Sequence, residues 1–570
     1  MKLILQYVKP YWRRVTAGMS IKLMGTVMDL LIPYILAYII DTVTPRGDMH
    51  GVLLWGGLMI FCSAAALILN VLANRSASAV ARDCTRRLRH DLFGHIVHMN
   101  SREIDRITIP SLISRMTTDT FYIYRTLGMT QRLGIRAPIM LLGGILITLT
   151  LDPVLSLILI VMLPFMAGIV LFISRKGIPL YENLQQRVDM LVRTVRENAS
   201  GVRIIKALGK GEDEKKRFHE INKGVAQQET KASAIMAVNN PTMQFLLYFG
   251  LVLVVLTGAK RVDSGLTQPG KIMAFLSYFT IILNAMLSVT RFLTMFSKAL
   301  ASANRIEEVM ATPVETEKML EAAAESGAPH IEFKNVTFSY GGVQPSVENI
   351  SFALKRGQTL GILGPTGAGK STLIRLLLRF YDTDEGTVLL NGQDVRSMPL
   401  SRLRSSVGAV FQSDALFRGT IEENIRLGRE ISMEEINDAL SRAQAESFVA
   451  EKGGTDSEVH SHGSNFSGGQ QQRLLLARAL AGTPDILLLD DATSALDFKT
   501  EAAFRKALRE KSEDITTVIV AQRISAVMHC DQILVMEDGR CMGLGTHEEL
   551  MKSCDLYREI AALQIGGEAV

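Results

Sequence analysis

Residues 364–372 read Gly364-Pro365-Thr366-Gly367-Ala368-Gly369-Lys370-Ser371-Thr372. An apolar run, 359–363, precedes them and an apolar helical pattern, 373–380, follows them, so we predict a strand, a glycine-rich turn and a helix start. Such a turn directs backbone N–H groups and the positive end of the helix at a phosphate. We expect Lys370 to reach the β- and γ-phosphates of a nucleotide and the Ser371 hydroxyl to bind Mg²⁺.

A second element of the same site is predicted downstream. Residues 486–489 form an apolar run that ends in Asp490, a pattern typical of a buried parallel strand. Such a strand would deliver the Asp490 carboxylate to a metal ion at its C-terminal end, although an aspartate in this place is also a candidate helix cap.

A third stretch lies between these two. Residues 465–473 read Asn465-Phe466-Ser467-Gly468-Gly469-Gln470-Gln471-Gln472-Arg473 and precede a helical pattern. The stretch resembles the signature motif of the ATP-binding cassette (ABC) proteins, with Phe466 where leucine is usual. The three motifs also stand in the family's order and approximate spacing. The resemblance implies that ATP binds at 364–372 and that Mg²⁺ is bound by Ser371, Gln412 and Asp490, the last through water.

Smaller motifs extend the resemblance over a whole α/β P-loop nucleotide-binding domain, predicted at 330–570. Tyr340 matches the aromatic residue that stacks on adenine, although a lone tyrosine is more often a packing residue. Gln412 matches the loop glutamine that senses Mg²⁺ and faces the membrane domain, and Glu458 matches an acidic residue implicated in coupling between domains. The loop that crosses between paired cassettes is matched by Ser494, Ala495, Leu496 and Asp497.

Two positions of the catalytic machinery depart from the family pattern. Asp491 stands where the resembled enzymes use a glutamate to position or deprotonate water, and Gln522 stands where they use a histidine near the γ-phosphate. The aspartate carboxylate ends about 1 Å short, and misplacement on that scale can cost on the order of 10²-fold in rate. Gln522 can hydrogen-bond a phosphate but cannot become cationic. We expect ATP binding to survive and hydrolysis at this site to be impaired.

Composition indicates a membrane part ahead of the cassette. The 570 residues are 48% hydrophobic, and the apolar excess lies before about residue 300. A net charge of +5 gives no indication of nucleic-acid binding. The five cysteines are scattered without metal-ligand or disulfide spacing. Hydropathy predicts six membrane helices, at about 15–41, 53–73, 135–151, 154–173, 243–258 and 272–296.

The two long links between these helices are basic, so we place them and the cassette in the cytoplasm. This arrangement resembles an ABC exporter half-transporter: an all-α six-helix transmembrane domain at 1–310, with long cytoplasmic extensions, joined to the cassette by a charged linker at 311–329. Family-like coupling helices are expected at about 104–119 and 197–207. Pro110 stands where the family more often has glycine, which leaves the start of the first uncertain.

The resemblance implies an ATP-driven exporter in a bacterial plasma membrane. Because paired cassettes bind each ATP between one phosphate loop and the other signature, we expect this chain to form a weak site and to complete a strong one on a partner. That partner would be a second half-transporter with the usual glutamate and histidine. Two alternatives stay open, namely a slow homodimeric exporter of lipids, peptides or drugs and a membrane-bound nucleotide sensor that does not pump.

The substrate is predicted only by class. A hydrophobic or amphiphilic small molecule of the multidrug type is favoured by analogy with the family. Polar residues within the helices are candidates for lining a cavity, although helix-to-helix hydrogen bonds would explain them equally well. These candidates are Asp29, Asn240, Asn284 and Arg291.

Overall fold

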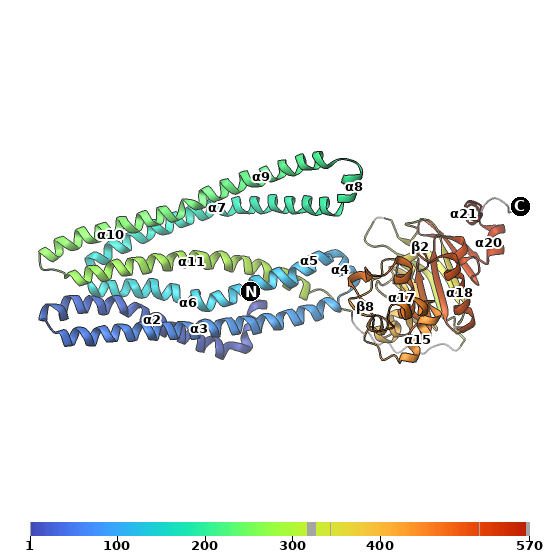
Figure 1. The fold of residues 1–570 in the computed structure, drawn as a ribbon, viewed down its shortest axis with the longest axis horizontal. Helices are drawn as coiled ribbons and strands as arrows, with labels where there is room; N and C mark the ends of the chain where they lie inside the picture. The colour runs from blue at the N-terminus through green and yellow to red at the C-terminus, as the bar shows by residue number, and fades with distance from the viewer. Residues whose placement is uncertain (1, 316–326, 343, 512–513, 566–570) are drawn as a thin grey trace. The chain divides into compact units, whose positions relative to one another are not determined.

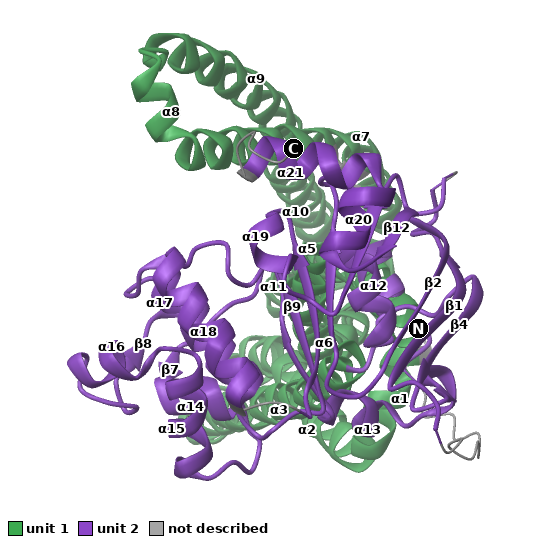
Figure 2. Ribbon diagram, turned by 90° about the vertical axis from the view of Figure 1, so that its right-hand side faces the viewer, with its two compact units in different colours: residues 1–97, 109–312 green, residues 98–108, 313–570 purple. Residues whose placement is uncertain are grey.

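The computed structural model describes residues 2–315, 327–342, 344–511 and 514–565. It divides into two compact units, residues 1–97 with 109–312, and residues 98–108 with 313–570 (Figure 2). The short segment 98–108 therefore belongs with the cassette, although it lies within the predicted transmembrane domain. The predicted linker includes 316–326, which lie outside the described residues.

The first unit contains six helices that are long and apolar enough to cross a membrane, as predicted. The first has about the predicted length, and the other five continue beyond their apolar segments, because a helix can extend through polar flanks that hydropathy does not detect. The six helices are α2 (Trp12–Tyr38), α3 (Met49–Val97), α6 (Thr120–Leu151), α7 (Pro153–Ser200), α10 (Asn239–Asp263) and α11 (Pro269–Met310).

Helices α2, α3, α6 and α11 pack against one another, while α7 packs along α10 and along the polar helix α9 (Gly211–Ala237) (Figure 1). Their core holds Tyr278, which is fully buried and donates a hydrogen bond to the Leu30 carbonyl oxygen at 2.6 Å. The remaining short elements of this unit are α1 (Lys2–Val8), η1 (Lys9–Tyr11), η2 (Ile39–Val43), η3 (Thr44–Arg46), α5 (Ile109–Ser114), η4 (Arg115–Asp119) and α8 (Val202–Ala207).

The first predicted coupling segment, 104–119, is not one helix. Helix α4 (Ser101–Ile107) ends at Thr108, whose φ of 71° breaks the helix, and α5 and η4 follow. Pro110 is the second residue of α5, where its missing N–H removes no intrahelical bond. The second predicted segment includes the end of α7 and all of α8.

The second unit is built on a six-stranded sheet of order β12-β11-β3-β10-β9-β6. All neighbours are parallel except the β11 and β12 pair. Since parallel strands end at one edge, the C-terminal ends of β3, β9 and β10 meet there. The strands are β3 (Thr359–Leu363), β6 (Val407–Val410), β9 (Ile486–Asp490), β10 (Thr516–Ala521), β11 (Gln532–Glu537) and β12 (Arg540–Gly545).

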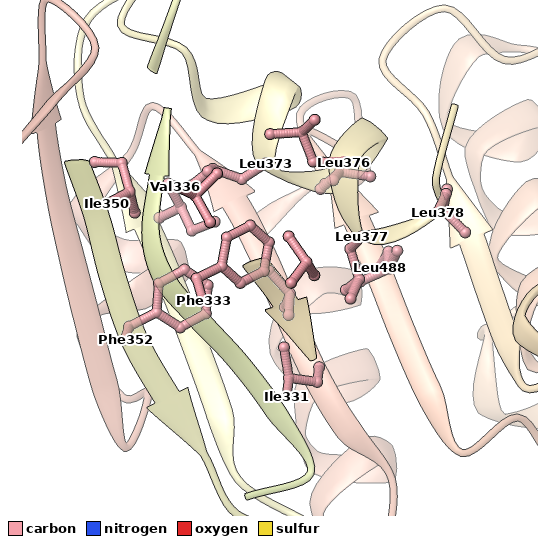
Figure 3. Close-up of a cluster of buried hydrophobic side chains, with 14 of the residues drawn as sticks. Ile331, Phe333, Val336, Ile350, Phe352, Leu373, Leu376, Leu377, Leu378 and Leu488 are labelled. Carbon is pink, nitrogen blue, oxygen red and sulfur yellow. The ribbon is translucent and has the colours of Figure 1, made fainter. Parts of the chain in front are cut away.

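An antiparallel sheet of order β2-β1-β4-β5 packs over the phosphate-loop helix. Alternating apolar residues on β1 point inward, and Phe333 stacks on Phe352 with ring centroids 4.6 Å apart. Figure 3 shows these rings beside Leu373 and Leu376 of α12 (Lys370–Leu377). The strands are β1 (Ile331–Phe338), β2 (Val347–Leu354), β4 (Glu385–Leu390) and β5 (Gln393–Asp394).

Helices complete the cassette. The signature stretch opens α17 (Gly468–Leu480), which packs with α14 (Ile421–Arg426) and α15 (Met433–Arg442). The other elements are η5 (Val395–Ser397), α13 (Leu400–Ser405), β7 (Gly419–Thr420), α16 (Glu446–Glu451), β8 (Glu458–Val459), η6 (Ser461–Gly463), α18 (Phe498–Lys511), α19 (Ile524–Val527), α20 (His547–Ser553) and α21 (Asp555–Ile565).

Candidate nucleotide site

The phosphate loop links β3 to α12, with the strand at the predicted residues. Two of its glycines cannot be replaced without a clash, since a Cβ on Gly364 would lie 2.1 Å from the Met536 carbonyl oxygen and one on Gly369 would lie 2.3 Å from that of Ser346. Both also have positive φ. The loop therefore packs tightly against its neighbours at the edge of the cavity.

Charged groups at the base of the loop are suited to a triphosphate and a divalent cation. Lys370 is buried, and its Nζ donates to the carbonyl oxygens of Gly364 and Pro365, both at 2.7 Å. Burial lowers the pKa of Lys370, whereas the carboxylates of Asp490 and Asp491 act in the opposite direction. A triphosphate beside it would stabilise its charge.

The Ser371 hydroxyl donates to Asp490 Oδ1 at 3.0 Å. Burial raises the pKa of Asp490, and the hydrogen bond from Ser371 acts in the opposite direction. A hydroxyl and a carboxylate at this separation are oxygen ligands of the kind that Mg²⁺ prefers, so the residues present fit that ion.

A cavity of about 860 Å³ opens above the loop. It is lined by phosphate-loop residues, among them Thr366, Gly367 and Thr372, and by the predicted residues of the other motifs. The latter are Tyr340, Gln412, Asp490, Asp491 and Gln522. The structure thus brings together side chains that the sequence separates by up to 182 positions, at the edge where β3, β9 and β10 end.

Tyr340 lies at the mouth of this cavity and is held by Arg375, which sequence reasoning missed. Arg375 Nη1 donates to Tyr340 Oη at 3.1 Å, and its guanidinium lies 5.9 Å from the ring centroid. The ring is 40% exposed, so one face remains available for a base.

Asp491 and Gln522 follow β9 and β10 directly. The Asp491 N–H donates to the Val520 carbonyl oxygen at 2.9 Å, and the residue has a φ of 53°. Short polar side chains tolerate this left-handed conformation better than most residues.

A glutamine of the C-terminal helix α21 fixes the backbone around Gln522. Gln564 Nε2 donates to the Gln522 carbonyl oxygen, and Gln564 Oε1 accepts from the Ile524 N–H, each at 2.8 Å. No local motif could have indicated this contact, because 42 residues separate the two glutamines.

The signature residues do not line the cavity. Ser467 caps α17 in a capping box with Gln470, and in the first turn of the helix Gly468 is exposed and Gly469 is half-buried. The side-chain amide of Gln472 donates to Ser494 Oγ at 3.1 Å and accepts from the Ala495 N–H at 2.8 Å. The signature helix is therefore tied to the predicted inter-cassette loop, 494–497.

Glu458 lies in β8, away from the cavity lining. Its carboxylate is 3.8 Å from Arg418 Nη2, and both side chains are largely exposed. Exposed ion pairs of this kind contribute little to stability, so the side chain is free to engage another surface.

A third feature missed from the sequence links the cassette to its segment 98–108. Tyr381 Oη donates to the Asp105 carboxylate on α4. The Tyr381 ring packs edge-on against Tyr340 with centroids 5.0 Å apart. Burial, followed by the hydrogen bond to Asp105, raises the pKa of Tyr381, so its phenol stays protonated and donates.

Among the described residues, no hydrogen bond or ion pair joins the four predicted cavity residues of the membrane helices. Asp29 forms an ion pair with Arg136 at 3.1 Å. Asn284 donates to the Thr280 carbonyl oxygen and Arg291 donates to Ser288 Oγ, both contacts within α11. Asn240 is exposed at the start of α10.

Six apolar helices followed by a phosphate-loop domain define an ATP-driven membrane exporter of the half-transporter class. Residues 15–286 match the model of the ABC transporter transmembrane region, and residues 347–494 match that of the ABC transporter domain. The chain belongs to the ABC transporter family, as a multi-pass membrane protein with a cytoplasmic ABC domain.

Relatives match the chain over nearly its whole length. It is 35% identical to an uncharacterized ABC transporter ATP-binding protein of Mycobacterium tuberculosis, over 99% of this chain and 98% of that protein. It is 32% identical to the ATP-dependent lipid A-core flippase of Photobacterium profundum, over 90% and 87%. The structure of a bacterial Atm1-family ABC exporter with ATP bound aligns with a TM-score of 0.82 at 26% identity, covering 98% of this chain and 99% of that one.

Proposed function

We propose that this chain is the weak-site half of a heterodimeric exporter of amphiphilic molecules. The observation that carries the proposal is the pair Asp491 and Gln522 at the edge of an otherwise complete nucleotide cavity. In this proposal residues 1–310 form the transport pathway, 330–570 form the cassette, and the segments near 104–119 and 197–207 couple the two.

The phosphate loop accounts for binding. Its N–H groups, Lys370 and the positive end of α12 all favour a triphosphate, and Tyr340 is available to stack on adenine. Mg²⁺, when bound by Ser371, Asp490 and Gln412, would neutralise phosphate charge. None of these groups is altered, so ATP should bind at ordinary affinity.

Hydrolysis depends on the two altered residues. A general base must lie within hydrogen-bond reach of the attacking water, and the Asp491 side chain is one methylene shorter than glutamate. Gln522 cannot supply positive charge to the phosphate as a protonated histidine does. The two changes together weaken both the positioning of water and the stabilisation of developing charge.

The intact signature supports a partner with a complete site of its own. Ser467 to Gln470 lie outside this chain's cavity, at a helix N-terminus suited to a phosphate bound elsewhere. On the partner's phosphate loop they would complete a strong site. Two copies of this chain would instead contain two impaired sites.

The restoring double variant tests this assignment. Asp491→Glu with Gln522→His, in the assembled transporter whose partner site is silenced, should raise ATP hydrolysis at least tenfold, because both missing functions return. Phosphate release measures the rate. An equal rate with and without the two changes would refute the proposed weak site, whereas Asp491→Asn serves as the matched variant that restores nothing.

A slow homodimer is the second candidate. The extensive likeness to the Atm1-family exporter and to the lipid A-core flippase favours active export over passive nucleotide sensing. Cross-linking of the chain in its native membrane distinguishes a homodimer from a heterodimer. A homodimer would give only a product of twice the mass of this chain.

A further inference from the structure

The four helices α2, α3, α6 and α11 carry an uneven distribution of charge. Segments 15–40, 52–81, 120–151 and 272–299 contain a single acidic residue, Asp29. The same segments contain seven basic residues, namely Lys22, Arg75, Arg125, Arg132, Arg136, Arg291 and Lys298. Charged residues in membrane helices are costly and usually mark a functional pathway.

Three of the basic residues lie near the cytoplasmic ends of the membrane-spanning segments. Arg136 and Arg132 precede the outer end of α6, Leu151, by about 22 and 28 Å of helix. Lys22 precedes the outer end of the first span by about 30 Å, because η2 continues α2 as far as Val43. A hydrocarbon core of about 30 Å places all three near its cytoplasmic boundary.

The only carboxylate in these segments does not neutralise the group. Asp29 Oδ2 accepts from Arg136 Nη2 at 3.1 Å and from Asn70 Nδ2 at 3.4 Å. Lys22 is 97% buried, and within the described residues its Nζ donates to the side-chain oxygens of Asn70 and Asn74, at 2.7 and 3.2 Å. These two amides accept two of its three hydrogens, and neither carries a charge.

Arg132 likewise has a neutral partner in the described structure, since its Nη2 donates to Ser78 Oγ at 2.9 Å. Gly128, one turn earlier on α6, leaves room for this guanidinium, because a Cβ there would lie 2.9 Å from Arg132 Nη2. Among the described residues, the buried Nε atoms of Arg132 and Arg136 have no acceptor. The cluster therefore retains both positive charge and N–H donors for one more group.

We propose that Lys22, Arg132 and Arg136 bind the acidic head of the transported molecule, a phosphate or a carboxylate on an apolar tail. This assignment rests on the proposed export function and narrows its substrate to anionic amphiphiles. Two guanidinium groups and an ammonium offer an anion charge-assisted hydrogen bonds that a neutral or cationic head cannot accept. The depth of the cluster lets such a head enter from the cytoplasmic leaflet while its tail stays in hydrocarbon.

Three probes with the same tail test the head-group preference. Dodecyl phosphate, dodecyl maltoside and dodecyltrimethylammonium are titrated onto the assembled transporter in phosphatidylcholine nanodiscs, and binding and ATP hydrolysis are both measured. Dodecyl phosphate should bind, and should alter hydrolysis, at concentrations at least tenfold below the other two. Equal concentrations for all three would overturn the proposal.

Variants assign the preference to these side chains. Lys22→Met and Arg136→Gln should each reduce the preference for dodecyl phosphate about tenfold, whereas Arg136→Lys should keep most of it. Arg75→Gln removes an exposed basic side chain from the same helices and should change nothing. Loss of preference in Arg75→Gln alone would contradict the assignment.

A translocation assay shows whether the bound molecule is transported or is only a structural lipid. It also tests the anion site and the export function separately. Fluorescent short-chain phosphatidylglycerol should cross liposomes in an ATP-dependent manner faster than the matched phosphatidylcholine. A binding preference without movement of any lipid or of the dodecyl probes would refute export and leave an anion site of structural lipid. Movement of neutral and cationic probes without preference would refute the anion site and leave export intact.

Discussion

At the scale of single residues, the altered site is held by contacts that do not involve the altered side chains. The Asp491 backbone is fixed to Val520, and the Gln522 backbone is fixed by Gln564. A restored glutamate or histidine would therefore start from a backbone that is already in place. For this reason we expect the gain from the restoring variant to depend on Gln564.

Gln564→Leu should remove most of that gain. Leucine keeps the size of the side chain but leaves the Gln522 carbonyl oxygen and the Ile524 N–H without their partner, so the loop is less well fixed. Phosphate release by the restored transporter should fall about tenfold, while ATP binding stays within about twofold, since Gln564 does not line the cavity. Gln564→Glu, which can accept from Ile524 but cannot donate to Gln522, should give an intermediate rate.

At the scale of elements, α4 contacts the cassette beside Tyr340, the proposed adenine-stacking residue. Tyr381 contacts Tyr340 through its ring and Asp105 through its hydroxyl. A nucleotide that moves Tyr340 therefore has a short route to α4. The coupling function that we propose for the segment near 104–119 begins at this contact.

Tyr381→Phe should separate transport from hydrolysis. Phenylalanine keeps the ring contact with Tyr340 and removes the hydrogen bond to Asp105, a contact to a charged group that contributes about 1.5–3 kcal/mol. We expect molecules transported per ATP to fall at least fivefold while ATP hydrolysis changes less than twofold. Asp105→Asn keeps an acceptor for the Tyr381 hydroxyl and should lose less transport per ATP. Equal losses of transport and hydrolysis in Tyr381→Phe would argue against this route.

The start of β1 carries a pH-sensitive contact. His330 is buried, and its Nδ1 lies 2.6 Å from Thr516 Oγ1 on β10. Burial, then the positive charge of Arg356, lowers the pKa of His330, while Asp485 acts in the opposite direction. The unfolded chain thus binds a proton near pH 6.5 that the folded cassette does not. The free energy of unfolding therefore keeps its full value above this pH and falls as the pH drops below it.

His330→Gln should remove that dependence, because glutamine can bond Thr516 and does not titrate. The free energy of unfolding of the wild-type cassette should fall by up to about 1.4 kcal/mol per pH unit below pH 6.5 relative to the variant. Hydrogen exchange of β1 amides in the full-length transporter, between pH 7.5 and 5.5, measures this difference. Parallel curves for the two proteins would contradict the expected titration.

At the scale of the whole molecule, two impaired sites in a symmetric assembly should drive little flux. In the proposed heterodimer only the partner supplies the usual glutamate and histidine, so the chain purified alone should hydrolyse ATP at less than about a tenth of the rate of the assembled transporter. Both preparations should bind ATP. Brisk hydrolysis and transport by the lone chain would point to the slow-homodimer alternative and away from unequal sites.

The sequence was sufficient to predict elements whose signal lies within a short stretch of residues. The strand at 359–363 and the buried strand ending in Asp490 were predicted because an apolar run followed by a functional group has a strong local signature. The six membrane helices were predicted for the same reason, but the lengths of five of them were not, since their polar extensions have no hydropathy signal. Pairs such as Gln522 with Gln564, or Asp29 with Arg136, depend on tertiary packing and could not be deduced from one sequence.

The single amide of Gln472 joins α17 to the loop that begins three residues after Asp491. If α17 shifts when a neighbouring cassette binds its own triphosphate, these hydrogen bonds would transmit the shift to the backbone beside Asp491, the proposed water-positioning residue. In the proposed heterodimer, the weak site would then sense the state of the strong one through one side chain, without any large rearrangement of the sheet.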